Sequence, residues 1–161
     1  MSLWLKSDVA KETSVEAVKT ILDFLLLDAA HESFLFPAGT DETVIFVAGN
    51  VMNEFGDWVE IVDNNAVTLS SKFAALPGHI SSVSARETSV KDKEYIFEIA
   101  YGAAKINVIR ASMLSATVQL SSIQQDRMRN PEIPAGQVVY YRMKCETASA
   151  TLEIKMRYHN H

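Results

Sequence analysis

The fold is decided by residues 136–158, which read GQVVYYRMKCETASATLEIKMRY. Residues 138–146 alternate between two sets of side chains, and residues 152–158 alternate between apolar and charged ones. This period of two is typical of β-strands that bury one face. The connecting residues 147–150 carry no apolar bulk and suit a short turn. The sequence therefore predicts one long antiparallel hairpin, whose apolar face further strands must cover.

Strand-like segments continue upstream, between turns that are rich in Gly, Pro, Asn and Asp. Residues 44–47 read VIFV and predict a strand that is buried on both faces. Residues 95–101 place four large apolar or aromatic side chains on one face. With the hairpin, nine or ten short strands result. The predicted fold is mainly β, an antiparallel two-sheet sandwich that is jelly-roll-like and spans residues 32–161.

One N-terminal amphipathic α-helix is predicted ahead of the strands, at residues 13–31. Thr13 and Glu16 form a capping box, in which each side chain satisfies a backbone amide that the helix leaves unpaired. Apolar residues then recur at helical spacing up to residue 27. Residues 1–12 are predicted to form an arm, in which Leu3, Trp4 and Leu5 are an apolar anchor on the sheet or on a neighbouring chain.

Length and composition indicate one ordinary globular domain. The chain has 161 residues, of which 48% are hydrophobic and 22% are charged. The N-terminus shows no basic start followed by an apolar block, so we expect no secretory signal. No apolar run is long enough for a membrane span. The single cysteine, Cys145, excludes an internal disulfide and favours assembly in a reducing compartment.

Charge is distributed unevenly along the chain. The net charge of −5 argues against nucleic-acid binding, which requires a concentrated positive surface. Residues 1–63 carry three basic and twelve acidic side chains, whereas residues 64–161 carry twelve basic and eight acidic ones. Two interpretations remain open. Either one end of the fold is simply more acidic, or the acidic part of one subunit meets the basic part of the next.

Catalytic and metal-binding patterns are sparse. His159 and His161 stand two residues apart, a spacing that can bind a metal ion from one face of a strand. A third ligand would have to come from His79, His31 or a carboxylate, and no sequence pattern brings these together. Glu60 and Glu98 could serve as an acid and base pair in sugar hydrolysis, but strand alternation favours polar faces for both. We therefore expect no metal, no cofactor and no catalytic residue, and a protein that is not an enzyme.

Contact with other chains is the function that the pattern favours. The loop at residues 124–135 contains two prolines, which stiffen it and keep it out of a sheet ladder. Stiff loops of this length often contact partners. The predicted contact residues come from the N-terminal arm, this loop and the C-terminal tail: Leu3, Trp4, Leu5, Arg127, Arg129, Pro131, Pro134, Tyr158, His159 and His161.

Residues 133–136, which read IPAG, lead into the strand at 138–142, and one further strand closes the chain. This layout resembles the late strands of jelly-roll virion proteins of tailed phages, of the head-decoration, cement or spike type. The resemblance implies a structural subunit, a homotrimer or another homo-oligomer that contacts other virion proteins, without nucleic acid or membrane. Such a subunit would be assembled in the host cytoplasm and reside in the virion. Two alternatives remain, a cupin-like β-barrel that binds a small ligand or metal, and a carbohydrate-active enzyme.

Overall fold

The computed structural model describes residues 18–19, 33–115, 124–127 and 130–161, with backbone alone at 124–127. The chain divides into two compact units, Met1–Glu32 and Ser33–His161, and all of the described strands belong to the second. Of the predicted helix at residues 13–31, only Val18 and Lys19 are described. Both are helical and exposed, and the rest lies outside the described residues, so the prediction of an N-terminal helix is not supported.

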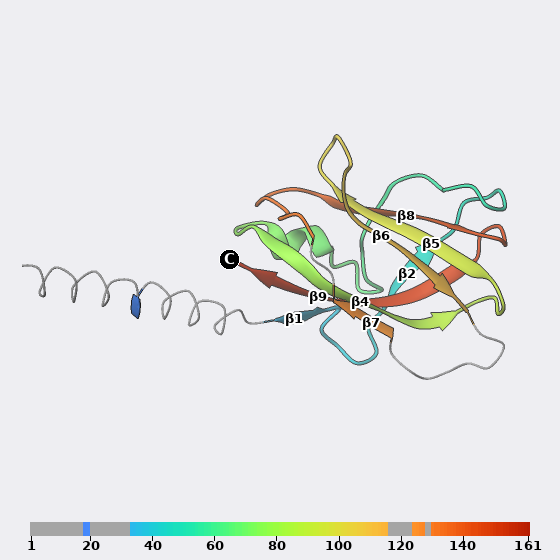
Figure 1. The fold of residues 1–161 in the computed structure, drawn as a ribbon, viewed down its shortest axis with the longest axis horizontal. Coiled ribbons are helices and arrows are strands. Elements are labelled where there is room, and N and C mark those ends of the chain that lie inside the picture. Colours follow the sequence, from blue (N-terminus) through green and yellow to red (C-terminus); the bar gives the residue numbers. More distant parts are fainter. Residues whose placement is uncertain (1–17, 20–32, 116–123, 128–129) are drawn as a thin grey trace, which may run out of the picture. The chain divides into compact units, whose positions relative to one another are not determined.

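The described part of the second unit is mainly β and contains two antiparallel sheets (Figure 1). Its elements, in chain order, are β1 (Phe34–Phe36), β2 (Val44–Val47), β3 (Val59–Glu60), the 3₁₀ helix η1 (Leu69–Phe73), β4 (Gly78–Thr88), β5 (Glu94–Tyr101), β6 (Ile106–Leu114), β7 (Gln124–Arg127), β8 (Val139–Cys145) and β9 (Thr151–Asn160). One sheet holds β1, β2, β4, β7 and β9, and the other holds β3, β8, β5 and β6.

Strand β9 is the centre of the five-stranded sheet. It pairs along one edge with β4, in a register that places His79 opposite His159. Along its other edge it pairs first with β2, where Val44 lies opposite Ile154, and then with β1. Strand β7 completes this sheet on the far edge of β4. The four-stranded sheet follows the order β3-β8-β5-β6, and β5 is bonded along both of its edges.

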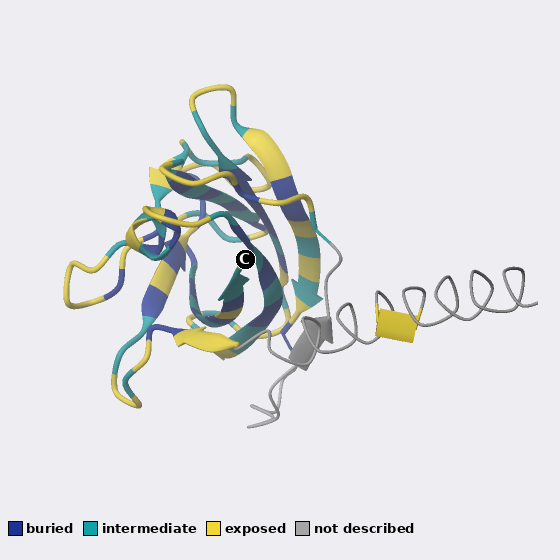
Figure 2. Cartoon of the chain, turned by 90° about the vertical axis from the view of Figure 1, so that its left-hand side faces the viewer, coloured by how far each residue is buried: buried dark blue, intermediate teal, exposed yellow. Residues whose placement is uncertain are grey.

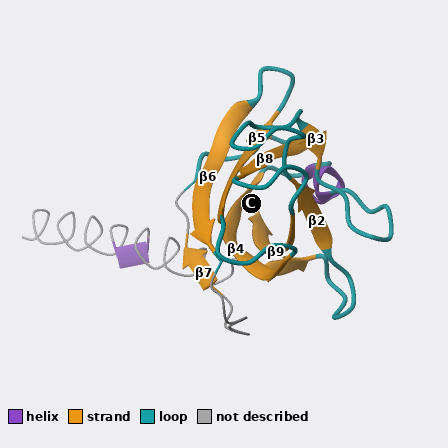
Figure 3. Ribbon diagram, turned by 90° about the vertical axis from the view of Figure 1, so that its right-hand side faces the viewer, coloured by secondary structure: helices purple, strands orange, loops and turns teal. Residues whose placement is uncertain are grey.

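The hydrophobic core lies between the two sheets. Figure 3 shows β5, β6 and β8 on one side of this core and β4 and β9 on the other. The ring of Phe46 stacks on that of Tyr141 with centroids 3.9 Å apart and meets Phe97 edge-on, so β2 is packed against the four-stranded sheet. Buried residues alternate with accessible ones along β8 and β9, and Figure 2 shows the buried positions on the strands that surround the centre.

The predicted hairpin of residues 136–158 is wrong. Both arms are strands, but β8 pairs with β5 and β3, whereas β9 pairs with β4, β1 and β2. The connection between them crosses from one sheet to the other and is bonded to the turn after β2. There Ala48 N–H donates to the Ala150 carbonyl at 2.8 Å, and Ser149 N–H donates to the Gly49 carbonyl at 2.9 Å. The apolar faces of the two arms therefore face each other across the core.

The prediction that residues 44–47 are buried on both faces is also wrong. Val44 and Phe46 are fully buried, but Ile45 is 48% exposed and Val47 is 45% exposed. The β-branched composition of the segment signalled a strand correctly. Composition does not show whether both faces of a strand are covered. Here the other sheet covers only one face of the strand, and two apolar side chains remain on its outer face.

Candidate metal centre

Three histidines converge at one end of the β4–β9 pair. His79 lies directly opposite His159 in the ladder, and His161 follows two residues later on the same chain. The ring centroids are 5.3 Å apart for His79 and His159, 4.8 Å for His79 and His161, and 4.9 Å for His159 and His161. Residues opposite one another in an antiparallel pair have their Cβ atoms about 5 Å apart. The register of two strands therefore brings the three imidazoles into one cluster.

The cluster lies on the outer face of the five-stranded sheet because of strand alternation. Leu152, Ile154, Met156 and Tyr158 point into the core and are buried, so the intervening residues of β9 point outward. In β4 the buried Ile80 faces Tyr158, which turns the neighbouring His79 outward as well. His79 and His159 are half-buried and His161 is exposed, so solvent reaches the cluster.

Backbone contacts hold this end of the ladder in register. A Cβ atom at Gly78 would clash with the carbonyl oxygen of His159, so only glycine permits the close approach of β4 and β9 here. The backbone N–H of His161 donates to the Pro77 carbonyl at 3.0 Å. The side-chain amide of Asn160 donates to the Lys72 carbonyl at 2.9 Å. The last residues of the chain are thereby fixed to the sheet.

The ring of His79 is oriented from its other side. Its Nδ1 lies 3.0 Å from the backbone carbonyl oxygen of Asn130. Because a carbonyl oxygen can only accept, Nδ1 donates in this hydrogen bond, and Nε2 is the nitrogen that the neutral ring offers to a metal ion. Asn130 is itself held by a 2.6 Å hydrogen bond from its amide to the Ile80 carbonyl. A hydrogen bond of this kind to the second ring nitrogen is typical of metal-binding histidines.

The donor atoms are close enough to share one ion. One nitrogen from each of His79, His159 and His161 lies within 4.8 Å of the other two. Two nitrogens bound to the same tetrahedral Zn²⁺ are about 3.4 Å apart, since each Zn–N bond is about 2.0–2.1 Å long. To share one ion, the nitrogens would therefore have to approach one another by at most about 1.4 Å, through rotation of their side chains. Imidazole ligands suit Zn²⁺, Cu²⁺, Ni²⁺ and Co²⁺ better than Mg²⁺ or Ca²⁺.

The sequence by itself predicts no metal site here. The spacing of His159 and His161 can bind a metal ion, but no sequence pattern selects His79 over His31 or a carboxylate as a third ligand. The missing information was the pairing of β4 with β9, because β9 was expected to pair with residues 138–146. His31, the other histidine considered, lies outside the described residues.

The predicted contact residues fall in different environments. Pro131 and Pro134 are exposed, and Arg127 ends β7. Tyr158 is buried, with its ring 5.6 Å from those of Phe34 and Phe73. Four of the predicted contact residues lie outside the described residues: Leu3, Trp4, Leu5 and Arg129.

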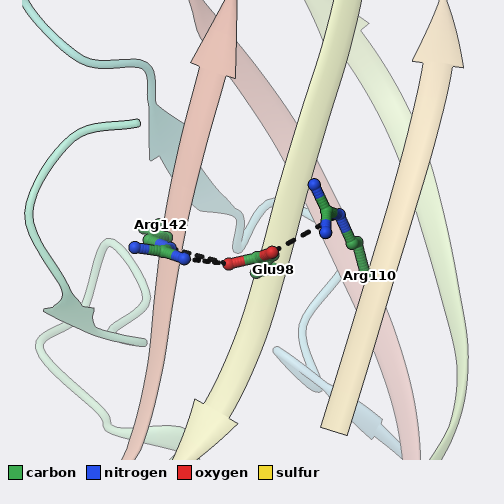
Figure 4. Close-up of polar contacts among 3 residues, drawn as sticks. All are labelled: Glu98, Arg110 and Arg142. Carbon is green, nitrogen blue, oxygen red and sulfur yellow. Dashed lines mark hydrogen bonds and ion pairs between the residues drawn. The ribbon is translucent and has the colours of Figure 1, made fainter. Parts of the chain in front are cut away.

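Glu98 lies on the outer face of the four-stranded sheet and is held by two arginines (Figure 4). Its Oε2 accepts from Nη2 of Arg142 at 2.6 Å and from Nε at 2.7 Å, and its Oε1 lies 3.4 Å from Nε of Arg110. The Arg142 guanidinium lies 4.6 Å from the ring centroids of Phe55 and Trp58, which cover the ion pair. Glu98 is thus engaged within the fold. Glu60 accepts a 2.6 Å hydrogen bond from Ser70, so both carboxylates of the hypothetical acid and base pair have structural partners.

The chain matches no protein-family model, no curated protein and no solved structure. Within the described part of the chain, no helix has the length and hydrophobicity needed to cross a bilayer.

Proposed function

We propose that this chain is a metal-binding β-sandwich protein that holds one divalent transition-metal ion, of which Zn²⁺ is the first candidate, at His79, His159 and His161. The convergence of three imidazole nitrogens within 4.8 Å carries the proposal. It departs from the expectation drawn from the sequence, that no metal is bound, because the ladder register supplies the third ligand that the sequence left unassigned.

Preorganisation supports metal binding at this position. His79 stands on β4 and His159 on β9, and His161 directly follows the end of β9. The backbone hydrogen bonds of an antiparallel ladder fix the distance between the two strands. Sites on regular elements are positioned more accurately than sites on loops. The hydrogen bond from Nδ1 of His79 leaves Nε2 of this ring available as the metal ligand. Little ordering is therefore needed before the ion binds.

Calorimetric titration of metal-free protein with Zn²⁺ tests the proposal. We expect one equivalent to bind to the wild-type protein. Replacing a residue that is hydrogen-bonded to a ligand typically lowers the metal affinity roughly 10- to 100-fold. Replacing a ligand itself should lower the affinity for Zn²⁺ by more than this. The variants His79→Ala and His159→Ala should therefore bind more than about 100-fold more weakly. Glu153→Gln is the matched control, because Glu153 lies on the same outward face of β9 and is also a potential metal ligand.

Circular dichroism of each variant shows whether the β-structure is retained. Weakened binding in the folded histidine variants, with wild-type affinity in Glu153→Gln, supports the site. Equal Zn²⁺ affinity in the wild-type protein and in the triple variant of His79, His159 and His161 would contradict it.

A second proposal is that the chain is a homo-oligomeric structural subunit, as the resemblance to phage virion proteins implies. The exposed apolar row on the outer edge of the five-stranded sheet favours contact with another copy. Leu35, Ile45 and Val47 lie opposite Arg157, Glu153 and Thr151, all on the outward face of β9, and are 42%, 48% and 45% exposed. Apolar side chains that gather on one face often mark protein interfaces.

Sedimentation at micromolar concentration tests the second proposal. We expect an oligomer in the wild-type protein, and a shift towards the monomer in Ile45→Lys, because a buried and unpaired ammonium group disfavours an interface. Deleting residues 1–8 tests the predicted apolar anchor in the same measurement. A monomeric wild-type protein would contradict this proposal and leave the metal site untouched.

A further inference from the structure

We infer that the metal centre keeps an exchangeable coordination position, directed outward from the sheet, which a small anion takes in place of a water molecule. This inference rests on the proposed metal site at His79, His159 and His161 and specifies the chemical class of its ligand.

Three protein side chains ligate the ion at the proposed site. Among the described residues, no aspartate, glutamate or cysteine joins the three histidines in the cluster. Zn²⁺ in a structural site is usually held by four protein ligands, whereas three protein ligands leave a position for water or an exogenous ligand. The three imidazoles therefore define an incomplete coordination sphere that a ligand from solution completes.

The placement of the cluster gives the direction of the remaining position. All three imidazoles project from the outer face of the β4–β9 pair, away from the core that Ile80 and Tyr158 occupy. His161 is exposed and the other two rings are half-buried. An ion bound by three rings on this face has the sheet behind it and solvent in front, so the free position points to solvent.

Charge selects the class of ligand. Three neutral imidazoles leave the full double positive charge of the ion in place, in contrast to sites with thiolate or carboxylate ligands. Arg157, two residues before His159 on the same outward face, is exposed and adds positive charge to this end of the sheet. The position therefore favours small anions such as acetate, azide or inorganic phosphate over neutral donors.

Visible absorption of the Co²⁺-loaded protein tests the inference. Four-coordinate Co²⁺ absorbs strongly in the visible region, and its bands change when a ligand is exchanged. We expect acetate, azide and phosphate, each added separately, to shift the bands of the wild-type protein in a saturable manner with one anion per Co²⁺. The Glu153→Gln protein should respond in the same way, and the His159→Ala protein should show no such bands.

The Co²⁺ experiment tests the metal site and the exchangeable position separately. If wild-type protein fails to develop the bands of bound Co²⁺, the metal site itself is refuted. If the bands form but remain unchanged with every anion, the site exists and the exchangeable position is refuted.

Two further measurements show whether a fourth protein ligand completes the coordination of the metal ion. In His31→Ala the anion response should equal that of the wild-type protein, and a response that emerges only in this variant would assign the fourth ligand to His31. Spectra recorded over a range of protein concentrations should superimpose after scaling. The spectra could instead change with protein concentration, and the anions could shift the bands only on dilution. This result would assign the fourth ligand to a second copy of the chain and overturn the inference.

Discussion

The outer faces of the two sheets both carry clusters of polar side chains, but the clusters differ in composition. On the four-stranded sheet, the carboxylate of Glu98 is paired with the guanidinium groups of Arg142 and Arg110, and two aromatic rings lie against that of Arg142. On the five-stranded sheet, His79, His159 and His161 are three groups of one kind. Groups of opposite charge attract one another without a further ligand, whereas three converging imidazoles match the ligand set of the proposed metal site.

The two clusters differ in whether their members satisfy one another. The Oε2 atom of the buried Glu98 carboxylate accepts two short bonds from one guanidinium, a charge-assisted contact that holds this side chain within the fold. The three imidazoles, of which that of His79 is oriented by a backbone carbonyl, place one nitrogen each within 4.8 Å of the other two. The first cluster stabilises the fold, and the second suits a ligand.

Arg142→Met is expected to have the largest effect on stability. It leaves Glu98, whose side chain is 5% exposed, without its closest partner, and removing one member of a buried pair costs roughly 3–5 kcal/mol. Arg110→Met is the control, because its side chain is 64% exposed and an exposed pair contributes at most about 1 kcal/mol. Urea unfolding measures both free energies. Equal losses would mean that the two guanidinium groups are equivalent and that the cluster is not the buried ion pair described above.

Zn²⁺ should stabilise the folded protein by about 2.7 kcal/mol when its free concentration is about 100 times the dissociation constant. An ion bound at the proposed site would connect β4 to the end of β9 and the residue that follows it, an arrangement that exists in the folded state only. Urea unfolding with Zn²⁺ and with a chelator measures the difference. It should persist in Glu153→Gln and vanish in His159→Ala. The same stabilisation in His159→Ala would show that Zn²⁺ acts elsewhere on the chain.

Asn130→Ala should weaken Zn²⁺ binding roughly 10-fold without removing a ligand. The Asn130 side chain donates to the Ile80 carbonyl and so positions the backbone carbonyl that orients His79. Calorimetric titration measures the change, and Asn107→Ala, an exposed asparagine on β6, is the control. Unchanged affinity in Asn130→Ala would mean that the orientation of His79 does not depend on this residue.

Tyr141→Phe tests the core layer between the two faces and should have the smallest effect, a loss of about 1 kcal/mol at neutral pH. Its hydroxyl accepts from Val47 N–H at 3.2 Å and lies 3.4 Å from the Ile45 carbonyl. Burial raises the pKa of Tyr141 above the ordinary value of 10.0, and the hydrogen bond from Val47 partly offsets this.

The raised pKa also sets a pH dependence. The fold favours the neutral hydroxyl, so this contribution to stability is complete below pH 10.0 and is lost as the pH rises through the folded pKa. Burial raises the pKa of Tyr95 and Tyr158 in the same direction. Melting temperatures recorded upward from neutral pH should therefore fall in the alkaline range, and less steeply in Tyr141→Phe. An identical alkaline slope in this variant would exclude a contribution from Tyr141.

The alternation of residues along the chain determined much of the fold. It predicted a mainly β protein with two antiparallel sheets, and it identified the buried faces of the last two strands, among them Met143, Ile154 and Met156. The spacing of His159 and His161 indicated two imidazoles close together at the end of a strand, and their ring centroids lie 4.9 Å apart, with His161 one residue beyond the end of β9. These properties are local, because the direction of a side chain depends only on its position along its own strand.

Only the tertiary structure decided which strands are neighbours. Alternation shows which face of a strand is buried but carries no information about the strand at its edge, so the arms of the expected hairpin could equally lie across the core from one another. For the same reason the sequence could not bring His79 to His159. Pairing between residues eighty positions apart is set by how all of the strands bury their apolar faces together, and that global packing creates the histidine cluster.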